Sequence, residues 1–477
     1  MLAPATATAA ACPAAPQGRC LGVAVPLDRS GAVPGTIKIR AARIASRRAG
    51  RPPIIGLTGG PGQAGVIYAK GFGQMLPTAG RDLVLLDQRG TGASGLLRCP
   101  SLEGTIKRFS AAIAACGQRL GAARSFYTSA DSAEDVEALR IRLGAPKIAL
   151  FAVSYGARVA VEYARRHPDR VERMILDSPV ATDAPDALAR ETLGAVGRVL
   201  RTVCRSGCGG AQAHPAADLQ RLVTRLRRSP IRRVVRRGGR RTRVSVSVDD
   251  VLGLLIAGDL DSEFLRSIPP AVRAALGGDS RPLVALTVST RGDGGGGAER
   301  ISSFNPAVYI ATTCEEGAFP WDPSASPEAR RAQARAALAA TPASAFAPFD
   351  RAAGLSFGLL PLCGNWPARR RVTAALPPLP TTVATLIVSG DLDLRTPLEN
   401  ARRLASALKA RVVVERGAGH SVLEDPNACA TPAVEAFLAG RPLPRCRSGG
   451  AFITIDRAAR ALPAPPSGLT GWATRPR

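Results

Sequence analysis

The sequence predicts an α/β fold, with a mostly parallel sheet flanked by helices and an inserted, mainly helical cap domain. Four apolar runs have the length of buried strands: 53–57, 82–87, 147–152 and 173–177. Helical patterns separate the last three of these runs. Because strands that alternate with helices favour parallel pairing, we expect a sheet covered by helices on both faces.

Local signals place the other elements of the N-terminal half. Two segments have strand character, 20–28 and 36–44. Ser132 and Asp135 form a capping-box pattern, which predicts a helix over 132–144. A further helix is expected over 155–166, directly after the third apolar run.

The strand–helix rhythm stops near residue 181 and returns near 381. The intervening stretch contains a hairpin pattern, a glycine tract and an Ala-rich helix, at 231–248, 292–297 and 327–340. The rhythm then resumes with a strand, a helix and a strand, at 384–390, 398–409 and 411–415. We therefore expect a discontinuous core formed by 1–180 and 381–477, with the cap at 181–380.

The net charge of +27 raises the question of a nucleic-acid partner. Basic residues are scattered, except for a dense run at 225–243 that is predicted to be a hairpin turning at Gly238 and Gly239. Arginines on the solvated face of that hairpin explain the run, and contact with an anionic surface or substrate is the alternative. Zinc-ligand spacing and aromatic RNA-binding motifs do not accompany the charge. We expect no nucleic acid, no metal and no cofactor.

Ten cysteines indicate an oxidising compartment, because eight of them fall in neighbouring pairs and two remain to pair with each other. The expected disulfides are Cys12–Cys20, Cys99–Cys116, Cys204–Cys208, Cys314–Cys363 and Cys429–Cys446. Buried free thiols in a cytosolic protein are the alternative. The first eleven residues resemble the tail of a signal peptide, and we expect either a truncated start or a removed signal. The sequence has no uninterrupted apolar stretch of spanning length. A secreted or cell-surface protein is expected.

The segment 147–168 carries the main chemical signal. An apolar strand runs directly into Ser154, and a helix begins at once. This is the context of a nucleophile elbow, a strand-to-helix turn that exposes a serine hydroxyl above the sheet in the α/β-hydrolase fold. Ala152 replaces the first glycine of the usual G-x-S-x-G pattern, and Gly156 keeps the second. A serine that only caps the helix is the alternative.

A serine nucleophile needs a base, and the chain has three histidines. His167 ends the elbow helix and His214 lies in a loop, whereas His420 follows the last core strand. In this fold the triad appears in the chain order serine, acid, histidine, which favours His420. Asp391 and Asp393 both follow the strand at 384–390, and the turn geometry favours Asp393 as the acid.

A tetrahedral intermediate also needs hydrogen-bond donors for its oxyanion. The backbone N–H of Tyr155, next to the nucleophile, is one expected donor. The glycine-rich loop 54–65 offers the second, for which we favour Gly60. This loop lacks the lysine of a phosphate-binding P-loop.

Taken together, these motifs resemble those of the proline iminopeptidase-like α/β hydrolases, and within them the secreted tripeptidyl aminopeptidases of actinobacteria. The matching segments are TGGPGQ at 58–63, LVLLDQRGTGASG at 83–95, AVSYG at 152–156, SGDLDLRTP at 389–397 and GAGHSVL at 417–423. Two looser matches lie in the cap, ATTCEEG at 311–317 and LCGNWP at 362–367. The family often has histidine where this chain has Thr58.

The resemblance implies release of amino acids or short peptides from free peptide N-termini. It assigns Ser154, Asp393 and His420 to the triad, and it makes DQRG at 87–90 a support for the active-site loop. Acidic cap residues bind the substrate ammonium in such enzymes, and Glu316 is the first candidate here, followed by Glu315. The alternative for both is an ordinary surface carboxylate.

Three functions are weighed on this basis. The first is an aminopeptidase that acts through an acyl-enzyme. The second keeps that mechanism but takes an ester or another small acyl substrate, because one scaffold supports several hydrolases. The third is a non-catalytic, polyanion-binding surface protein, which the intact serine, aspartate and histidine argue against. The oligomeric state is not predicted.

Overall fold

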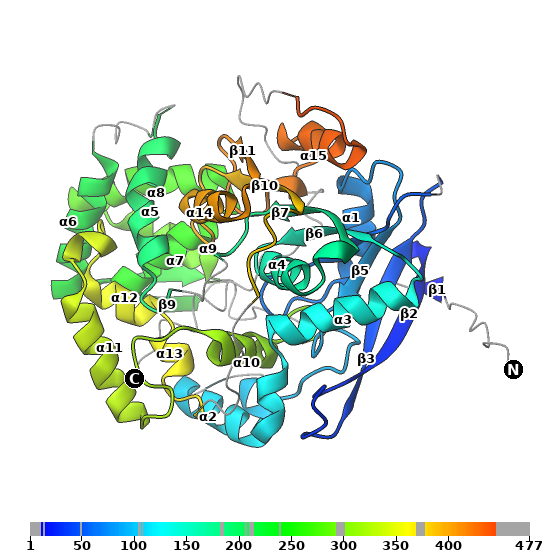
Figure 1. Ribbon diagram of the computed structural model, residues 1–477. Helices are drawn as coiled ribbons and strands as arrows, with labels where there is room; N and C mark the ends of the chain where they lie inside the picture. Colours follow the sequence, from blue (N-terminus) through cyan, green and yellow to red (C-terminus); the bar gives the residue numbers. More distant parts are fainter. Residues whose placement is uncertain are drawn as a thin grey trace, which may run out of the picture.

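A nine-stranded sheet forms the centre of the described structure (Figure 1). The computed structural model describes residues 11–12, 15–47, 50–103, 106, 108–181, 186–205, 208, 214–237, 240–291, 301–368 and 377–444. Within these residues the strand order is β1-β2-β3-β5-β4-β6-β7-β10-β11. The strands from β5 to β11 in this order pair in parallel, and β1 to β3 extend one edge in antiparallel pairing. The predicted α/β class with a mostly parallel sheet is confirmed.

The strands follow the apolar runs of the sequence closely. Their bounds are β1 Ala11–Cys12, β2 Ala15–Pro26, β3 Thr36–Ile44, β4 Ile54–Leu57, β5 Leu83–Asp87, β6 Ile148–Val153, β7 Val171–Asp177, β10 Ala384–Gly390 and β11 Arg411–Glu415. The largest difference is β2, which begins five residues before the predicted start at Cys20 because its first residues pair with β1 and with the end of β3.

The alternation of side chains shows why the central strands are apolar throughout. In β6, Ile148 and Leu150 face one hydrophobic cluster, while Ala149 and Phe151 face another on the opposite side of the sheet. All of β6 is buried. A strand covered on both faces gains nothing from polar residues, so its pattern is a continuous apolar run.

Helices cover the two faces of the sheet. The residues of α1 (Ala69–Met75) and α15 (Ala430–Ala439) pack in one cluster, and those of α3 (Ser129–Arg142), α4 (Gly156–Arg166) and α14 (Leu398–Leu408) pack in the other. Figure 1 shows α3 and α4 side by side, and these two helices pack against each other along their length. The elbow helix therefore lies directly on the sheet.

The predicted start of the helix over 132–144 is wrong by about one turn. The helix α3 begins at Ser129, and Thr128 is its cap: the Thr128 hydroxyl accepts from the Asp131 N–H, and the Asp131 carboxylate accepts in return. The same Ser/Thr-x-x-Asp spacing occurs twice in succession. Asp135, which the sequence suggested as a capping residue, instead lies inside the helix and is buried against Arg89.

The region between β7 and β10 is mainly helical. Its helices are α5 Arg190–Val203, α6 Pro215–Arg228, α7 Val248–Gly258, α8 Ser262–Leu276, α9 Arg281–Thr290, α10 Pro306–Glu316, α11 Pro327–Ala340, α12 Arg351–Phe357 and α13 Leu360–Cys363. The five helices from α5 through α9 share one hydrophobic cluster. The helix α10 instead packs in a cluster formed with the sheet. The division at 181–380 remains a prediction, and α10 lies within it although it packs with the core.

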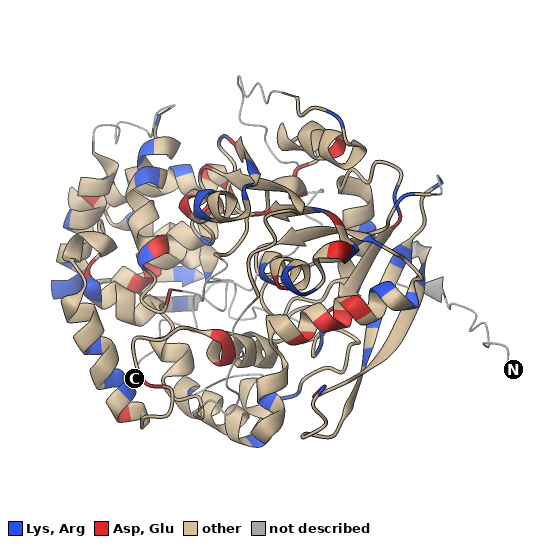
Figure 2. Cartoon of the chain, in the orientation of Figure 1, with Lys and Arg blue, Asp and Glu red and all other residues tan. Residues whose placement is uncertain are grey.

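The predicted basic hairpin is present as β8 (Ile231–Arg237) and β9 (Arg240–Val246). Its turn at 238–239 and the glycine tract at 292–297 lie outside the described residues. Ile231, Val244 and Val246 are buried, whereas five arginines of the hairpin are exposed, namely Arg232, Arg233, Arg236, Arg241 and Arg243. Figure 2 shows Lys and Arg spread over many elements of the chain, and several Asp and Glu on α3.

Disulfides join Cys99 to Cys116, Cys204 to Cys208, and Cys314 to Cys363. Cys20 and Cys429 are also disulfide-bonded, and their predicted partners, the Cys12 side chain and Cys446, lie outside what the structure describes. Because Cys314 is on α10 and Cys363 on α13, their bridge ties together two segments that pack on the core.

The number of residues between the two cysteines ranks how much each disulfide is expected to stabilise the protein. The Cys314–Cys363 bridge spans 49 residues and the Cys204–Cys208 bridge only 4. Chain entropy predicts that replacing the first pair by alanine lowers the free energy of unfolding by about 4 kcal/mol, against about 2 kcal/mol for the second. Urea unfolding of the two double variants, with all other bridges intact, measures both values. Equal losses would contradict the chain-entropy explanation.

In the described part of the chain, no helix is long and apolar enough to cross a membrane. The same residues contain no group of three or more His, Cys, Asp or Glu side chains placed to hold a metal ion.

Candidate active site

Ser154 lies in the turn between β6 and α4, with a backbone φ of 55°. Residues with a β-carbon seldom adopt this conformation, and such strain is concentrated at functional sites. The turn is tight, because a β-carbon on Gly156 would lie 2.4 Å from the Leu57 carbonyl oxygen. Ala152 fits in the strand before the turn and is fully buried. The described geometry is that of a nucleophile elbow.

The glycine-rich loop after β4 lies against this serine. A β-carbon on Gly59 would lie 2.9 Å from Ser154 Cβ and 3.4 Å from its Oγ. Gly60 has a φ of 105°, which is open to glycine and strained for other residues. Among the described residues, the N–H groups of Gly60 and Tyr155 donate to no protein acceptor, whereas the Gly59 N–H is bonded to Gln63. Two backbone donors therefore remain available near the serine.

The motif at 87–90 holds this loop in place. Asp87 Oδ1 accepts from the N–H groups of Gly65 and Val66, at 2.9 and 2.8 Å. Gln88 Nε2 donates to the Thr58 carbonyl at 2.9 Å. These bonds explain the support role that the family resemblance implies for the motif.

Arg89 anchors the motif in the core. Its guanidinium makes two bonds of 2.7 Å with the Asp135 carboxylate, and both side chains are 1% exposed. It also donates to the carbonyls of Leu27 and Phe126. One arginine therefore connects the residue after β2, the 3-10 helix Gly121–Phe126 and α3 to the motif that supports the glycine loop.

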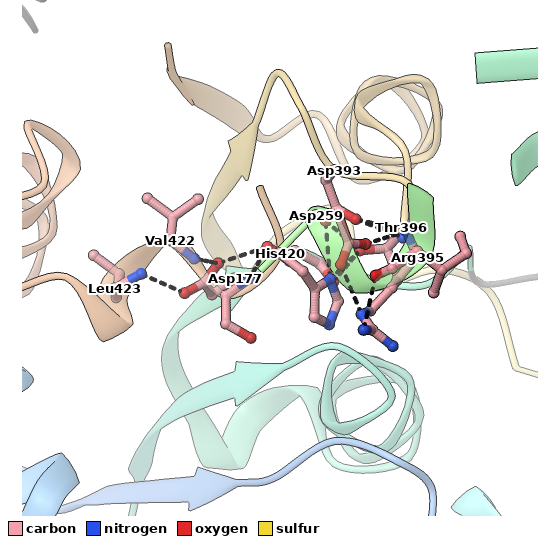
Figure 3. A network of polar contacts seen from close by, with 11 residues as sticks. Asp177, Asp259, Asp393, Arg395, Thr396, His420, Val422 and Leu423 are labelled. Carbon is pink, nitrogen blue, oxygen red and sulfur yellow. Dashed lines mark hydrogen bonds and ion pairs between the residues drawn. The ribbon is translucent and has the colours of Figure 1, made fainter. Parts of the chain in front are cut away.

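His420 and Asp393 lie together on the loops that follow β11 and β10 (Figure 3). His420 Nδ1 is 2.9 Å from Asp393 Oδ2, and the Asp393 side chain is completely buried. Asp393 Oδ1 accepts from the N–H groups of Arg395 and Thr396, each at 2.9 Å. Thr396 Oγ1 is 2.7 Å from Asp393 Oδ2. Two backbone N–H groups and the Thr396 hydroxyl therefore surround the acid, and Oδ2 faces the imidazole.

Asp177, at the end of β7, ties the histidine loop to the serine turn (Figure 3). Its carbonyl accepts from the Ser154 N–H at 2.9 Å, and its carboxylate accepts from the N–H groups of Val422 and Leu423 at 3.0 and 2.8 Å. The neighbouring Ser178 hydroxyl accepts from the Ser421 N–H at 2.9 Å. The loop that carries His420 is thereby fixed beside the strand next to Ser154.

The described residues show no hydrogen bond between the Ser154 hydroxyl and His420. Catalytic hydrogen bonds are often long in a free enzyme and shorten when substrate binds. The His420–Asp393 pair and Ser154 thus lie on separate loops, and Asp177 connects the His420 loop to the Ser154 turn by hydrogen bonds.

The imidazole of His420 is 6% exposed. Burial disfavours its charged form, but the Asp393 carboxylate and, beyond it, Asp259 outweigh this effect and raise the pKa of His420 above its ordinary value. Burial also raises the pKa of Asp177, although its hydrogen bonds with Leu423, Ser178 and Val422 oppose the shift.

The remaining candidates have other surroundings. His167 caps the end of α4 and lies 3.2 Å from Glu134, and His214 precedes α6 on the surface. The Asp391 carboxylate accepts from the Gly417 N–H at 2.7 Å and so stabilises the turn after β11. None of these three groups contacts His420 or Ser154 in the described structure.

Glu315 and Glu316 are both paired with arginine. Glu315 is buried, 3.1 Å from Arg124 Nε and 2.8 Å from Trp366 Nε1, so its suggested part in binding a substrate ammonium is not supported. Sequence reasoning could not foresee this network, since its members lie far apart in the chain. Glu316 lies 3.2 Å from Arg158 Nε and accepts from the Ser129 N–H. Its role in substrate binding stays a prediction.

Comparison with known proteins defines the class. Residues 52–200 match the family model described as alpha/beta hydrolase fold, and residues 350–448 match the model described as TAP-like protein. Fold, site and family model together define an α/β hydrolase.

Curated relatives extend over most of the chain. "Serine protease Hip1" of Mycobacterium tuberculosis is 25% identical over 427 residues, which cover 81% of this chain and 78% of the relative. "Tripeptidyl aminopeptidase" of Streptomyces coelicolor is 23% identical over 467 residues, covering 88% and 80%. A "probable proline iminopeptidase" of the same organism is 31% identical over 145 residues, covering 30% and 38%. The protein is accordingly an α/β hydrolase with a TAP-like C-terminal segment.

Proposed function

We propose that this protein is a serine aminopeptidase, with Ser154 as nucleophile, His420 as general base and Asp393 as the orienting acid. The observation that carries the proposal is the buried Asp393–His420 pair, tied through Asp177 to a strained serine turn. A serine in a sparsely populated conformation beside two unbonded backbone donors is typical of a functional site. Such a site fits acyl transfer.

The reaction follows from the positions of these groups. The Ser154 oxygen attacks the substrate carbonyl carbon while its proton passes to His420 Nε2. The N–H groups of Gly60 and Tyr155 stabilise the oxyanion, and the start of α4 adds the positive end of its helix dipole. The C–N bond then breaks, the imidazolium protonates the leaving amine, and water releases the acyl group by the reverse sequence.

The names of the relatives support a peptide as the substrate, because tripeptidyl aminopeptidase and proline iminopeptidase both act at peptide N-termini. An ester or another small acyl compound is the second candidate, because the same machinery cleaves esters. The three described disulfides support an exported protein. We propose secretion or attachment at the cell surface.

Two measurements test the proposal. Chromogenic aminoacyl and tripeptidyl amides are compared with simple esters, and a fluorophosphonate probe is used to label wild type and Ser154→Ala. We expect turnover of an amide with a free amino terminus and labelling of wild type alone. Turnover of esters only would exclude the aminopeptidase, and equal labelling of both proteins would exclude Ser154 as the nucleophile.

The pH dependence follows from the state of His420. The general base must be neutral, and the carboxylates near it raise its pKa. Activity is therefore lost as pH falls through that raised pKa. We expect the acid limb of kcat/KM to have its midpoint above the pH at which a free imidazole titrates. A midpoint below that pH would contradict the assigned surroundings of His420.

A further inference from the structure

Asp259 forms a buried ion pair beside the proposed base (Figure 3). Its carboxylate has no exposed area, and it accepts from Arg395 Nε at 2.9 Å and from the Arg395 backbone N–H at 3.0 Å. Asp259 follows α7, within the predicted cap, whereas Arg395 follows β10 of the sheet. The pair thus joins the cap to the loop of the catalytic acid.

The backbone of Asp259 contacts the histidine loop directly. Its carbonyl accepts from the His420 N–H at 2.9 Å. A β-carbon on the preceding residue, Gly419, would lie only 1.5 Å from that carbonyl oxygen, so the loop can approach only because residue 419 is glycine. The cap residue therefore sets the backbone position of the base.

Arg395 is shared between the acid and the cap. Its backbone N–H lies 2.9 Å from Asp393 Oδ1 as well as 3.0 Å from Asp259 Oδ2. Its Nη2 donates to the Ile256 carbonyl of α7 at 2.9 Å, and 19% of its side chain is exposed. Removing the Asp259 charge would leave this guanidinium uncompensated near the imidazole.

The charged groups that act on His420 come from several elements. Asp393 and Asp259 favour the imidazolium, Arg395 opposes it, and Asp177 and Glu424 also interact with it electrostatically. Burial raises the pKa of Asp259 to about 6 against the opposing effect of Arg395. The Asp259–Arg395 pair therefore places two opposite charges beside the imidazole, and their effects on it oppose each other.

We propose that Asp259 is a positioning residue through which the cap holds the general base, His420, in place. Its carbonyl fixes the His420 backbone, and its carboxylate neutralises Arg395 beside the imidazole. The inference rests on the proposed role of His420. It follows that a displacement of α7 from the sheet would impair activation of Ser154 even for a substrate too small to contact the cap.

The rate of fluorophosphonate labelling against pH tests this inference without reference to the substrate. We expect Asp259→Asn to lower the plateau rate about 10- to 100-fold, because the weakened bonds to Arg395 loosen the tie between α7 and the Asp393 loop, which aligns the base. The acid limb also moves to lower pH, because the uncompensated guanidinium disfavours the imidazolium. In Asp259→Asn/Arg395→Gln both charges are absent, and the limb returns toward the wild-type position.

Asp261→Asn is the matched control, because Asp261 caps the start of α8 two residues away. Its labelling rate is expected to keep the acid limb at the wild-type pH. An acid limb of the labelling rate that stays at the wild-type pH in folded Asp259→Asn would overturn the inference. A rise in KM for peptides with an unchanged labelling rate would also overturn it, because the Asp259–Arg395 pair would then be a substrate-binding group. Absence of labelling in wild type would instead remove the proposed function itself.

Discussion

Replacement of His420 by alanine is expected to lower kcat by about 10⁴- to 10⁶-fold, because the serine hydroxyl then has no base to accept its proton. The imidazole is buried on Asp393, in a loop outside the strands of the sheet. The variant should still fold, because the Asp393 carboxylate keeps the N–H groups of Arg395 and Thr396 as donors. Steady-state turnover of the best substrate from the chromogenic panel measures the loss, and single-turnover kinetics show that it lies in the chemical step.

The chain supplies two matched controls for this prediction. His167→Ala removes an imidazole that contacts Glu134 at the end of α4, and we expect kcat within a few-fold of wild type. Asp393→Asn is expected to lower kcat by about 10⁴-fold through loss of the correct tautomer, whereas Asp391→Asn should affect mainly the turn at Gly417. A large loss for His167→Ala with little loss for His420→Ala would mean that the wrong base was chosen.

Replacement of Arg89 by methionine is expected to lower the free energy of unfolding by about 3–5 kcal/mol. The substitution breaks the buried Arg89–Asp135 pair and leaves Asp135 with Arg29, which lies 2.6 Å away and is 30% exposed; breaking a buried pair on one side costs about this much. It also leaves the carbonyls of Leu27 and Phe126 unbonded. Urea denaturation with the disulfides intact gives the value. Activity should fall as well, because Arg89 anchors the loop that offers Gly60.

Two variants separate this effect from the general loss of an arginine. Arg98→Met removes an exposed ion pair with Glu103, and we expect an unfolding midpoint close to wild type. Arg89→Met/Asp135→Asn should be less destabilised than the sum of the two single variants, because the double change also removes the carboxylate that has lost its buried partner. Additive losses would show that Arg89 and Asp135 act independently.

The hydrophobic pattern was enough to predict most of the fold. The runs that became β4, β5, β6, β7, β10 and β11 are apolar because both faces of the sheet are covered, and this requirement is visible in the local sequence. The start of α3 was missed because two capping patterns follow one another. Only the burial of Asp135 against Arg89 distinguishes them, and the two residues are 46 positions apart.

The part of the candidate site that depends on local sequence was also predictable. The serine turn and the Asp393–His420 pair follow local strand ends, and the structure brings the latter two together at 2.9 Å. Asp177 is the last residue of a strand, so its position at the end of 173–177 could have marked it. Arg395 and Thr396 lie within the motif at 389–397 but were not singled out. Asp259 gave no signal, because it meets Arg395 across 136 residues.

The amino-acid sequence by itself determined the order of strands and helices, the strained serine and the side chains of the proposed triad. These depend on hydrophobic period, turn chemistry and chain order, all of which are local. Only the tertiary structure decided which carboxylates are already paired with an arginine. Glu315 is neutralised by Arg124, Asp135 by Arg89 and Asp259 by Arg395, and each pair is separated by tens of residues or more. The state of a buried charge depends on its neighbours in space, and folding alone brings those neighbours together.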